Sequence, residues 1–351
     1  MKLGIIGLEQ SGKTTVFNAL TGSDKEVGTF GKIEAHVAIV KVPDERIDFL
    51  SKLYNPKKTA YATIEFVDIP GSINNTSDAK VIAASREVDA FVFTLRAFTN
   101  ASVPHPLDSI DPIRDHDQIK LGLILADMSI ADKRYERLNK SVTKGAGTAE
   151  EKLEFSALGK IMEKLQHEKY ASEAVLTEQE EKAIRAFQFL TRKPYLSLVN
   201  VSDNALSSNE TTELVQKIPN SMAISANIEM EIRKLDEKDR SAFLSDLGLN
   251  EPSINLFIRK AYQTLGLISF FTVGEDEVRA WTINKGLNAQ AAAGKIHSDL
   301  ERGFIRAEVF SFADIKELGS EQDAKKAGRF RLEGKEYIVQ DGDIVNIKFS
   351  V

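Results

Sequence analysis

Apolar runs and helical patterns alternate along the first hundred residues of the chain. Four apolar runs are predicted strands: residues 3–6, 35–42, 62–67 and 90–95. A helical stretch begins at Thr14, directly after the first run, and another at 79–86 precedes the last. Because strands and helices alternate, we expect an α/β fold with a mostly parallel sheet and helices on both of its faces.

The pattern becomes helical in the middle of the chain. Residues 104–116 are rich in Pro, Asp and His, which predicts a loop. Apolar residues then recur at helical spacing over 117–142 and again over 153–165, with a Gly-containing break between them. These two stretches predict an antiparallel helical hairpin. A third helix is predicted after Thr177, which has the side chain of a good N-cap.

The α/β pattern returns near Pro194, so the helical segment is predicted to be an insertion. Strands are expected at 195–201 and 221–225 with a helix between them, followed by helices over 230–247 and 254–265. Short alternating segments then predict a small α+β domain from residue 267 onward. Its expected strands lie at 268–273, 280–283, 307–312, 337–339 and 344–349, and its expected helix at 289–302.

Composition adds limits to this picture. A chain of 351 residues is long enough for roughly two or three domains. It contains no cysteine, which excludes disulfides, thiolate metal sites and cysteine catalysis. No apolar run approaches the length of a membrane span, so we expect a cytoplasmic protein. The net charge of −6 gives no global basic footprint for nucleic acid, and Arg192-Lys193 is expected to be a solvated pair.

The most specific motif lies between the first predicted strand and helix. Residues 7–14 read Gly-Leu-Glu-Gln-Ser-Gly-Lys-Thr, a complete G-x-x-x-x-G-K-T phosphate-binding loop. Its glycines allow backbone N–H groups to surround phosphate oxygens, and the helix N-terminus favours negative charge. Lys13 is expected to reach the β- and γ-phosphates, and the Thr14 hydroxyl to bind Mg²⁺. This loop predicts a nucleoside triphosphate site.

Three weaker motifs follow in the order that a purine-nucleotide site requires. Asp68 and Gly71 end a predicted strand, where Asp68 would hold Mg²⁺ and the Gly71 N–H would face the γ-phosphate. Asn200 would stabilise neighbouring loops, and Asp203 would accept hydrogen bonds from the base edge. Residues 225–227 would supply backbone contacts to the base. Guanine offers two adjacent donors on that edge and adenine offers one, so the base stays open on these residues alone.

With these motifs in order, the chain resembles the Obg-like ATPase family of the YchF type, a branch of the translation-factor class of P-loop GTPases. The resemblance covers nearly the whole length and is strongest in the C-terminal part, which looks like the family's TGS domain. The matching segments lie at 7–15, 42–46, 63–69, 86–90, 124–127, 235–240, 271–275, 278–282, 303–309 and 337–343.

The resemblance implies three domains, ATP binding with slow hydrolysis, and association with ribosomes or RNA. A G domain would comprise residues 1–103 and 194–266, an inserted helical hairpin 104–193, and a β-grasp TGS domain 267–351. Lys13 and Gly71 are the expected catalytic groups, and Thr14 and Asp68 the expected Mg²⁺ ligands. The expected nucleotide-binding residues are Glu9, Gln10, Ser11, Gly12, Lys13, Thr14, Thr15, Asn200, Asp203, Ser225, Ala226 and Asn227.

Departures from the family pattern cluster around the phosphate end. Glu9 and Gln10 stand where the family has Pro and Asn, and Lys32 stands at the position of its Mg²⁺-sensing threonine, with Thr29 as a possible substitute. The segment after Gly71 is shortened and begins with Ser72, and the base motif ends in Asp203 instead of Glu. Two functions therefore stay open: a slow ATPase, with GTP as an alternative substrate, and a nucleotide-binding scaffold without turnover that docks a ribosome or protein partner.

Overall fold

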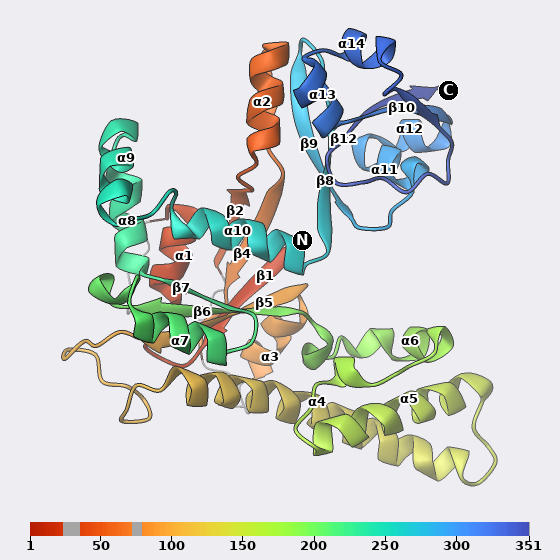
Figure 1. Cartoon of the computed structure of the whole chain (residues 1–351). Helices are drawn as coiled ribbons and strands as arrows, with labels where there is room; N and C mark the ends of the chain where they lie inside the picture. The colour runs from red at the N-terminus through yellow and green to blue at the C-terminus, as the bar shows by residue number, and fades with distance from the viewer. Residues whose placement is uncertain (24–35, 72–78, 351) are drawn as a thin grey trace. The chain divides into compact units, whose positions relative to one another are not determined.

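The chain forms two compact units in the computed structural model, which describes residues 1–23, 36–71 and 79–350 (Figure 1). The first unit comprises Met1–Ala38 and Glu65–Ile254, and the second comprises Ile39–Ile64 and Asn255–Val351. Within the described ranges, no helix is both long enough and apolar enough to cross a membrane.

A six-stranded sheet forms the centre of the first unit, and the boundary of that unit falls within strands β2 and β4. Its strands run in the order β2-β4-β1-β5-β6-β7, and every neighbouring pair from β4 to β7 is parallel. The strands are β1 (Lys2–Gly7), β2 (His36–Lys41), β4 (Thr63–Asp68), β5 (Ala90–Ala97), β6 (Tyr195–Val201) and β7 (Ser221–Ile224). The predicted α/β fold is therefore confirmed, and the carboxyl ends of β1, β4, β5 and β6 meet at one edge, as ligand sites in such sheets require.

Helices cover both faces of this sheet (Figure 1). Side chains of α3, α4 and α7 share one buried core with the strands, and α1 packs against α8. The helices are α1 (Lys13–Thr21), α3 (Ala79–Arg86), α7 (Asn209–Lys217), α8 (Ala226–Lys234) and α9 (Glu237–Asp246). The single helix expected over 230–247 is wrong, because the Asp236 side chain accepts the Asp239 N–H at 2.9 Å and starts α9 as a new helix.

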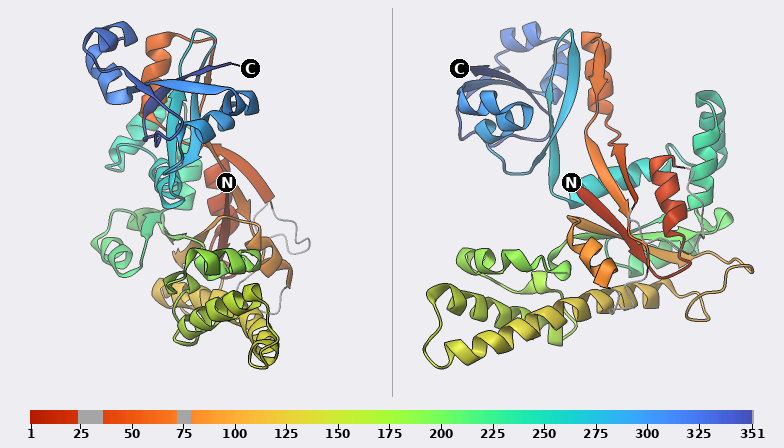
Figure 2. Two further views of the ribbon diagram at one scale, coloured as in Figure 1. Left: turned by 90° about the vertical axis from the view of Figure 1, so that its right-hand side faces the viewer. Right: turned by 180° about the vertical axis from the view of Figure 1, so that it is seen from behind.

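The predicted insertion is a helical arm built from α4 (Pro112–Val142), α5 (Ala149–Gln166) and α6 (Glu178–Ile184) (Figure 2). The expected loop over 104–116 is wrong at its end: Asp111 caps α4 and Pro112 occupies its first turn, so the helix begins five residues before the predicted start. Thr177 is confirmed as the N-cap of α6, where it forms a capping box with Glu180.

An aromatic stack and a two-bond ion pair connect helices α4 and α5 of the arm. The Tyr135 ring of α4 stacks on Phe155 of α5, with 4.4 Å between the ring centres. Beside that stack, the Arg134 guanidinium makes two bonds of 2.7 Å to the Glu154 carboxylate. The arm therefore has its own core, separate from that of the sheet.

The second unit has a mixed six-stranded sheet in the order β11-β10-β12-β8-β9-β3. Its strands are β3 (Lys58–Ala60), β8 (Leu267–Thr272), β9 (Glu277–Asn284), β10 (Phe304–Ser311), β11 (Arg331–Glu333) and β12 (Asp343–Phe349). Its helices are α2 (Glu45–Tyr54), α10 (Ser253–Thr264, starting at the end of the first unit), α11 (Ala289–Ile296), α12 (Ser298–Arg302), α13 (Phe312–Leu318) and α14 (Glu321–Lys326). Strands β12 and β8 are parallel between antiparallel neighbours, which is the arrangement of a β-grasp domain.

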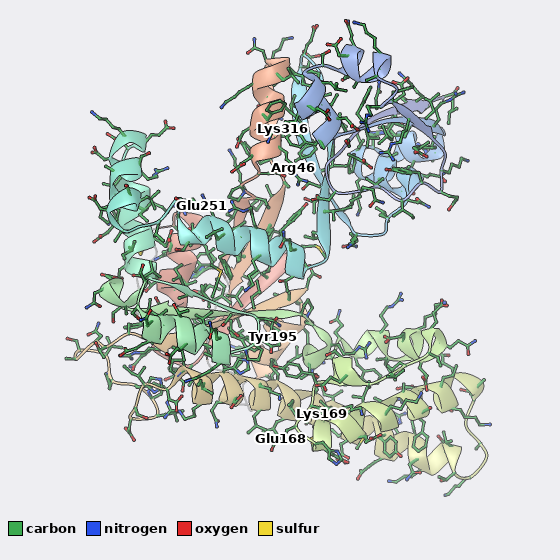
Figure 3. The ribbon with its side chains drawn as sticks, in the orientation of Figure 1. Arg46, Glu168, Lys169, Tyr195, Glu251 and Lys316 are labelled. Atoms are coloured by element: carbon green, nitrogen blue, oxygen red, sulfur yellow. The ribbon has the colours of Figure 1, made fainter. Side chains whose placement is uncertain are left out.

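This unit differs from the sequence prediction in several features, and helices α13 and α14 and strand β11 were not predicted. Residues 337–339 are not a strand, because only Ile338 makes an isolated bridge, to Asn288. The helix expected over 289–302 is two helices, since the His297 side chain caps α12. Strand β3 pairs in parallel with β9, so a segment from the first sixty residues belongs to the C-terminal unit. Arg46 of α2, which is labelled in Figure 3, bonds Asp341 at 2.8 Å.

Candidate nucleotide-binding site

The turn between β1 and α1 can be formed only with glycines at its two ends. Gly12 has φ +88°, and a Cβ atom there would lie 2.5 Å from Nδ2 of Asn200. A Cβ atom on Gly7 would lie 2.5 Å from the Thr94 carbonyl oxygen. Gly12 is also the N-cap of α1 and offers no side chain to the first N–H groups of the helix. Those N–H groups form a ready site for phosphate oxygens.

Lys13 lies in a buried position within this turn. Its Nζ donates to the carbonyl oxygens of Gly7, at 3.0 Å, and Leu8, at 2.7 Å. Burial lowers the pKa of Lys13 to about 8, while the carboxylates of Asp68 and Glu9 oppose that shift. Within the described residues the hydrogen bonds of this ammonium group go to neutral carbonyls, so it gains strongly from an anionic ligand.

Thr14 and Asp68 converge beside Lys13. The Thr14 hydroxyl donates to Oδ2 of Asp68 at 3.3 Å, although the two residues are 54 positions apart. One hydroxyl and one carboxylate are the hard oxygen ligands that Mg²⁺ takes from a protein when substrate phosphates supply further ligands. The pair therefore fits Mg²⁺. Gly71 follows at φ +100°, and a Cβ atom there would lie 2.8 Å from Val81 of α3.

The loops expected at the base end are joined by hydrogen bonds. Asn200 donates to the Ser11 carbonyl at 3.4 Å and accepts the Ala226 N–H at 3.2 Å, so one amide ties the phosphate loop to the 225–227 loop. The Ser225 hydroxyl donates to the Asp203 carboxylate, and the Ser225 side chain also caps α8. Ser225 therefore holds Asp203 in place.

A cavity of about 610 Å³ connects these parts. Its lining includes eight of the expected residues: Gln10, Gly12, Lys13, Thr14, Thr15, Asn200, Asp203 and Asn227. The other expected residues do not line it: Glu9, Ser11, Asp68, Gly71, Ser225 and Ala226. Three of these residues are hydrogen-bonded to residues that do line the cavity. Asp68 is bonded to Thr14. Ser225 is bonded to Asp203, and Ala226 is bonded to Asn200.

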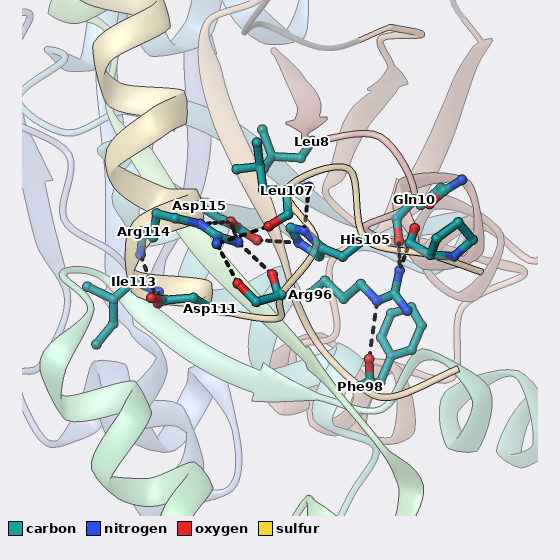
Figure 4. Close-up of polar contacts among 12 residues, drawn as sticks. Leu8, Gln10, Arg96, Phe98, His105, Leu107, Asp111, Ile113, Arg114 and Asp115 are labelled. Atoms are coloured by element: carbon teal, nitrogen blue, oxygen red, sulfur yellow. Dashed lines mark hydrogen bonds and ion pairs between the residues drawn. The ribbon is translucent and has the colours of Figure 1, made fainter. Parts of the chain in front are cut away.

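Sequence reasoning missed one wall of this cavity. Phe98, Thr99, Asn100 and Val103 line it, and the buried Arg96 bonds the backbone behind them (Figure 4). The available signal was an arginine at the end of the apolar strand over 90–95, since a charged side chain at that place needs buried partners. Thr29, Lys32 and Ser72, the expected departures near the γ-phosphate, lie outside the described residues.

The fold and the phosphate loop define a P-loop protein of the GTPase class. In agreement, a family model described as a 50S ribosome-binding GTPase matches residues 2–127. The C-terminal YchF GTPase model, described as a protein of unknown function, matches residues 267–350.

Full-length relatives define the family. The chain is 40% identical to the ribosome-binding ATPase YchF of Bacillus subtilis, over 99% of each chain. It is also 40% identical to the ribosome-binding ATPase YchF of Haemophilus influenzae, over 100% of this chain and 99% of the relative. The solved structure of the Schizosaccharomyces pombe YchF GTPase superposes with a TM-score of 0.85 at 29% identity, covering 99% of this chain and 97% of that one. The chain belongs to the YchF family.

Proposed function

We propose that the protein binds a purine nucleoside triphosphate with Mg²⁺, hydrolyses it slowly and acts as a conformational switch. One observation carries this proposal. A single cavity is lined by Lys13 and Thr14, with Asp68 bonded to Thr14, and also by Asn200 and Asp203. Cationic and hydroxyl groups suit a triphosphate, whereas an amide and a carboxylate suit the edge of a purine.

Each residue at the phosphate end has a role that follows from its chemistry. Lys13 would neutralise charge on the β- and γ-phosphates, and the N–H groups at the start of α1 would bind phosphate oxygens. Thr14 and Asp68 would hold Mg²⁺, which shields the phosphate charge when bound. Gly71 would report the γ-phosphate to α3, because it packs directly on Val81.

ATP is the favoured ligand, and GTP is the alternative. The relatives from Bacillus subtilis and Haemophilus influenzae are named ATPases, which supports ATP. Asp203 supports GTP as the alternative, since a carboxylate can accept both donors of guanine, although here it already accepts the Ser225 hydroxyl. Parallel calorimetric titrations with Mg²⁺ and non-hydrolysable ATP and GTP analogues decide between them.

The relatives' names also support a ribosomal partner, with the helical arm and the C-terminal domain as docking parts in the cytoplasm. A scaffold without turnover is the second candidate function. Among the described residues that line the cavity, Asp203 is the only carboxylate, and it lies at the base end. A general base for the attacking water is therefore absent from that lining, which favours slow or no hydrolysis.

Turnover by the purified protein separates the two functions. We expect Lys13→Ala to lower the rate of phosphate release by at least about 100-fold, because it removes the charge that faces the transferred phosphoryl group. Lys169→Ala is the matched control, since Lys169 is an exposed lysine of the helical arm (Figure 3). If the wild-type protein binds nucleotide but releases phosphate no faster than Lys13→Ala, the hydrolase function is wrong and the scaffold function takes its place.

A further inference from the structure

Arg96 is a buried arginine whose hydrogen bonds within the described part of the chain all go to backbone carbonyl groups. Only 2% of the residue is exposed. The strongest bonds run from Nη2 to the Val103 carbonyl, at 2.7 Å, and from Nε to the Phe98 carbonyl, at 3.2 Å. Longer bonds of 3.5 Å run from Nη1 to Gln10 and Pro104. Burying a guanidinium without a bonded carboxylate is costly, so Arg96 is expected to have a role beyond packing.

The position of Arg96 in the sheet places it beside the phosphate loop. On adjacent parallel strands, Arg96 of β5 pairs in register with Asn200 of β6. Arg96 bonds the Gln10 carbonyl, and Asn200 bonds the next carbonyl, that of Ser11. Gln10 has φ +60°, a conformation that is uncommon for a residue with a side chain, so its peptide needs support from neighbours. Two neighbouring side chains therefore hold consecutive peptides of the phosphate loop.

The same guanidinium holds the cavity wall that follows β5. Its Cζ lies 4.7 Å from the centre of the Phe98 ring, and its bonds to the Phe98 and Val103 carbonyls close the loop between them. Beyond the loop, His105 is bonded to the buried Asp115 of α4 at 2.8 Å (Figure 4). Arg96 thus holds the wall through its bonds to Phe98 and Val103, and the His105–Asp115 bond attaches the chain after the wall to α4.

We propose that Arg96 is a positioning residue for the nucleoside part of the ligand. It holds the 98–104 wall in one place against the phosphate loop, so that the base and ribose enter a preformed cavity. This inference rests on the proposed function. A planar guanidinium can reach several carbonyls at once, whereas a lysine ammonium at the same place reaches fewer and does not fix the loop.

Arg96→Lys tests the proposal because it keeps the charge. The matched control is Arg134→Lys, which breaks another two-bond arginine contact in the helical arm, away from the cavity. Each protein is titrated calorimetrically with Mg²⁺ and either a non-hydrolysable ATP analogue or inorganic tripolyphosphate. We expect Arg96→Lys to weaken the analogue about tenfold and tripolyphosphate less than about threefold, because Arg96 bonds the wall at 2.7 and 3.2 Å and the phosphate loop only at 3.5 Å. Arg134→Lys should bind both ligands as the wild type does.

The outcomes separate this inference from the proposed function. A folded Arg96→Lys protein that binds the analogue as tightly as the wild type would overturn the inference alone. Equal losses for both ligands would also overturn it, because Arg96 would then act only on the phosphate loop. A wild-type protein that binds neither ligand would overturn the proposed function and this inference with it.

A measurement on the wild type keeps the proposal testable if the variant does not fold. Hydrogen exchange of the amides in 98–104 should slow when the ATP analogue binds and stay unchanged with tripolyphosphate. The Val103 amide is a suitable reporter, because it donates to the Asn100 carbonyl at 3.1 Å within the wall. Unchanged exchange with the ATP analogue would show that the wall does not meet the nucleoside and would overturn the inference.

Discussion

Lys13 should make nucleotide affinity depend on pH. In the free protein its pKa is about 8, because burial disfavours the charged form. A bound triphosphate would stabilise the charged form and raise that pKa, so binding takes up a proton once the free lysine is neutral. We therefore expect constant affinity between about pH 7 and 8 and a decline above it that approaches tenfold per pH unit.

Titration with the non-hydrolysable analogue between about pH 7 and 9.5 measures this slope. Lys13→Arg serves as the control, because arginine stays charged throughout this range and should show no decline, whatever its affinity. A wild-type affinity that stays constant up to the highest pH would mean that Lys13 keeps its proton in the free protein, and the account of its burial would be wrong.

The residues of the site were predictable where a local motif dictates them. The glycines, Lys13 and Thr14 follow from one continuous loop, and the structure places Thr14 beside Asp68 as a Mg²⁺ site requires. Arg96 was not predictable in this way, because its partners lie in two separate stretches of the chain, the phosphate loop and the 98–104 wall. Its role depends on the register between β5 and β6, which no periodicity in the sequence reveals.

At the scale of elements, Lys193 connects helix α3 to the strand that follows the arm. Its Nζ donates to the carbonyls of Ser85, Arg86 and Val88 at 2.9, 2.6 and 2.5 Å, where α3 ends. The expectation that Arg192-Lys193 is a solvated pair is therefore wrong. A cation at a helix C-terminus satisfies carbonyls that have no partner within the helix.

Lys193→Met should destabilise the first unit by about 2 kcal/mol, because methionine has a similar length and leaves buried carbonyls without a donor. Chemical denaturation measures the loss. The exposed Lys169→Met, on the helical arm, should change stability by less than about 0.5 kcal/mol. Equal stability of the two variants would show that water replaces the ammonium group at the end of α3.

Elements with a strong hydrophobic period were predictable, whereas their ends were predictable only in some cases. Strand β6 begins and ends where expected, because its run lies between Pro194 and Ser202. Helix α4 begins earlier than expected because Asp111 and Pro112 were interpreted as loop residues, although together they form a helix start. Strand β3 has only three residues and no period of its own, so its pairing with β9 depends on tertiary structure.

At the scale of the whole molecule, the proposed domains and the compact units divide the chain differently. We propose a G domain of residues 1–103 and 194–266, an inserted arm of 104–193 and a TGS domain of 267–351. The compact units instead place Ile39–Ile64 with the C-terminal residues, since β3 extends the sheet of that unit beside β9. Every residue that lines the cavity belongs to the first unit.

This division predicts where nucleotide binding stabilises the molecule. At a ligand concentration of about 100 times Kd, binding adds about 2.7 kcal/mol to the stability of the unit that holds the site. We therefore expect the non-hydrolysable ATP analogue with Mg²⁺ to slow amide exchange in β1, β5 and β6, measured residue by residue. Exchange in β8, β10 and β12 of the second unit should not change, because their opening does not release the ligand.

Lys13→Ala provides the reference for this experiment, since a protein that does not bind the analogue should show no protection in either unit. Equal protection of both units in the wild type would contradict the prediction. It would mean that the units open together, and the free energy of nucleotide binding would then reach the β-grasp sheet. Protection confined to the first unit would instead mean that the stability of the second unit does not depend on nucleotide. A switch would then have to act within the first unit. There, Arg86 of helix α3 donates to the Phe187 carbonyl of the arm, so these two parts are directly bonded.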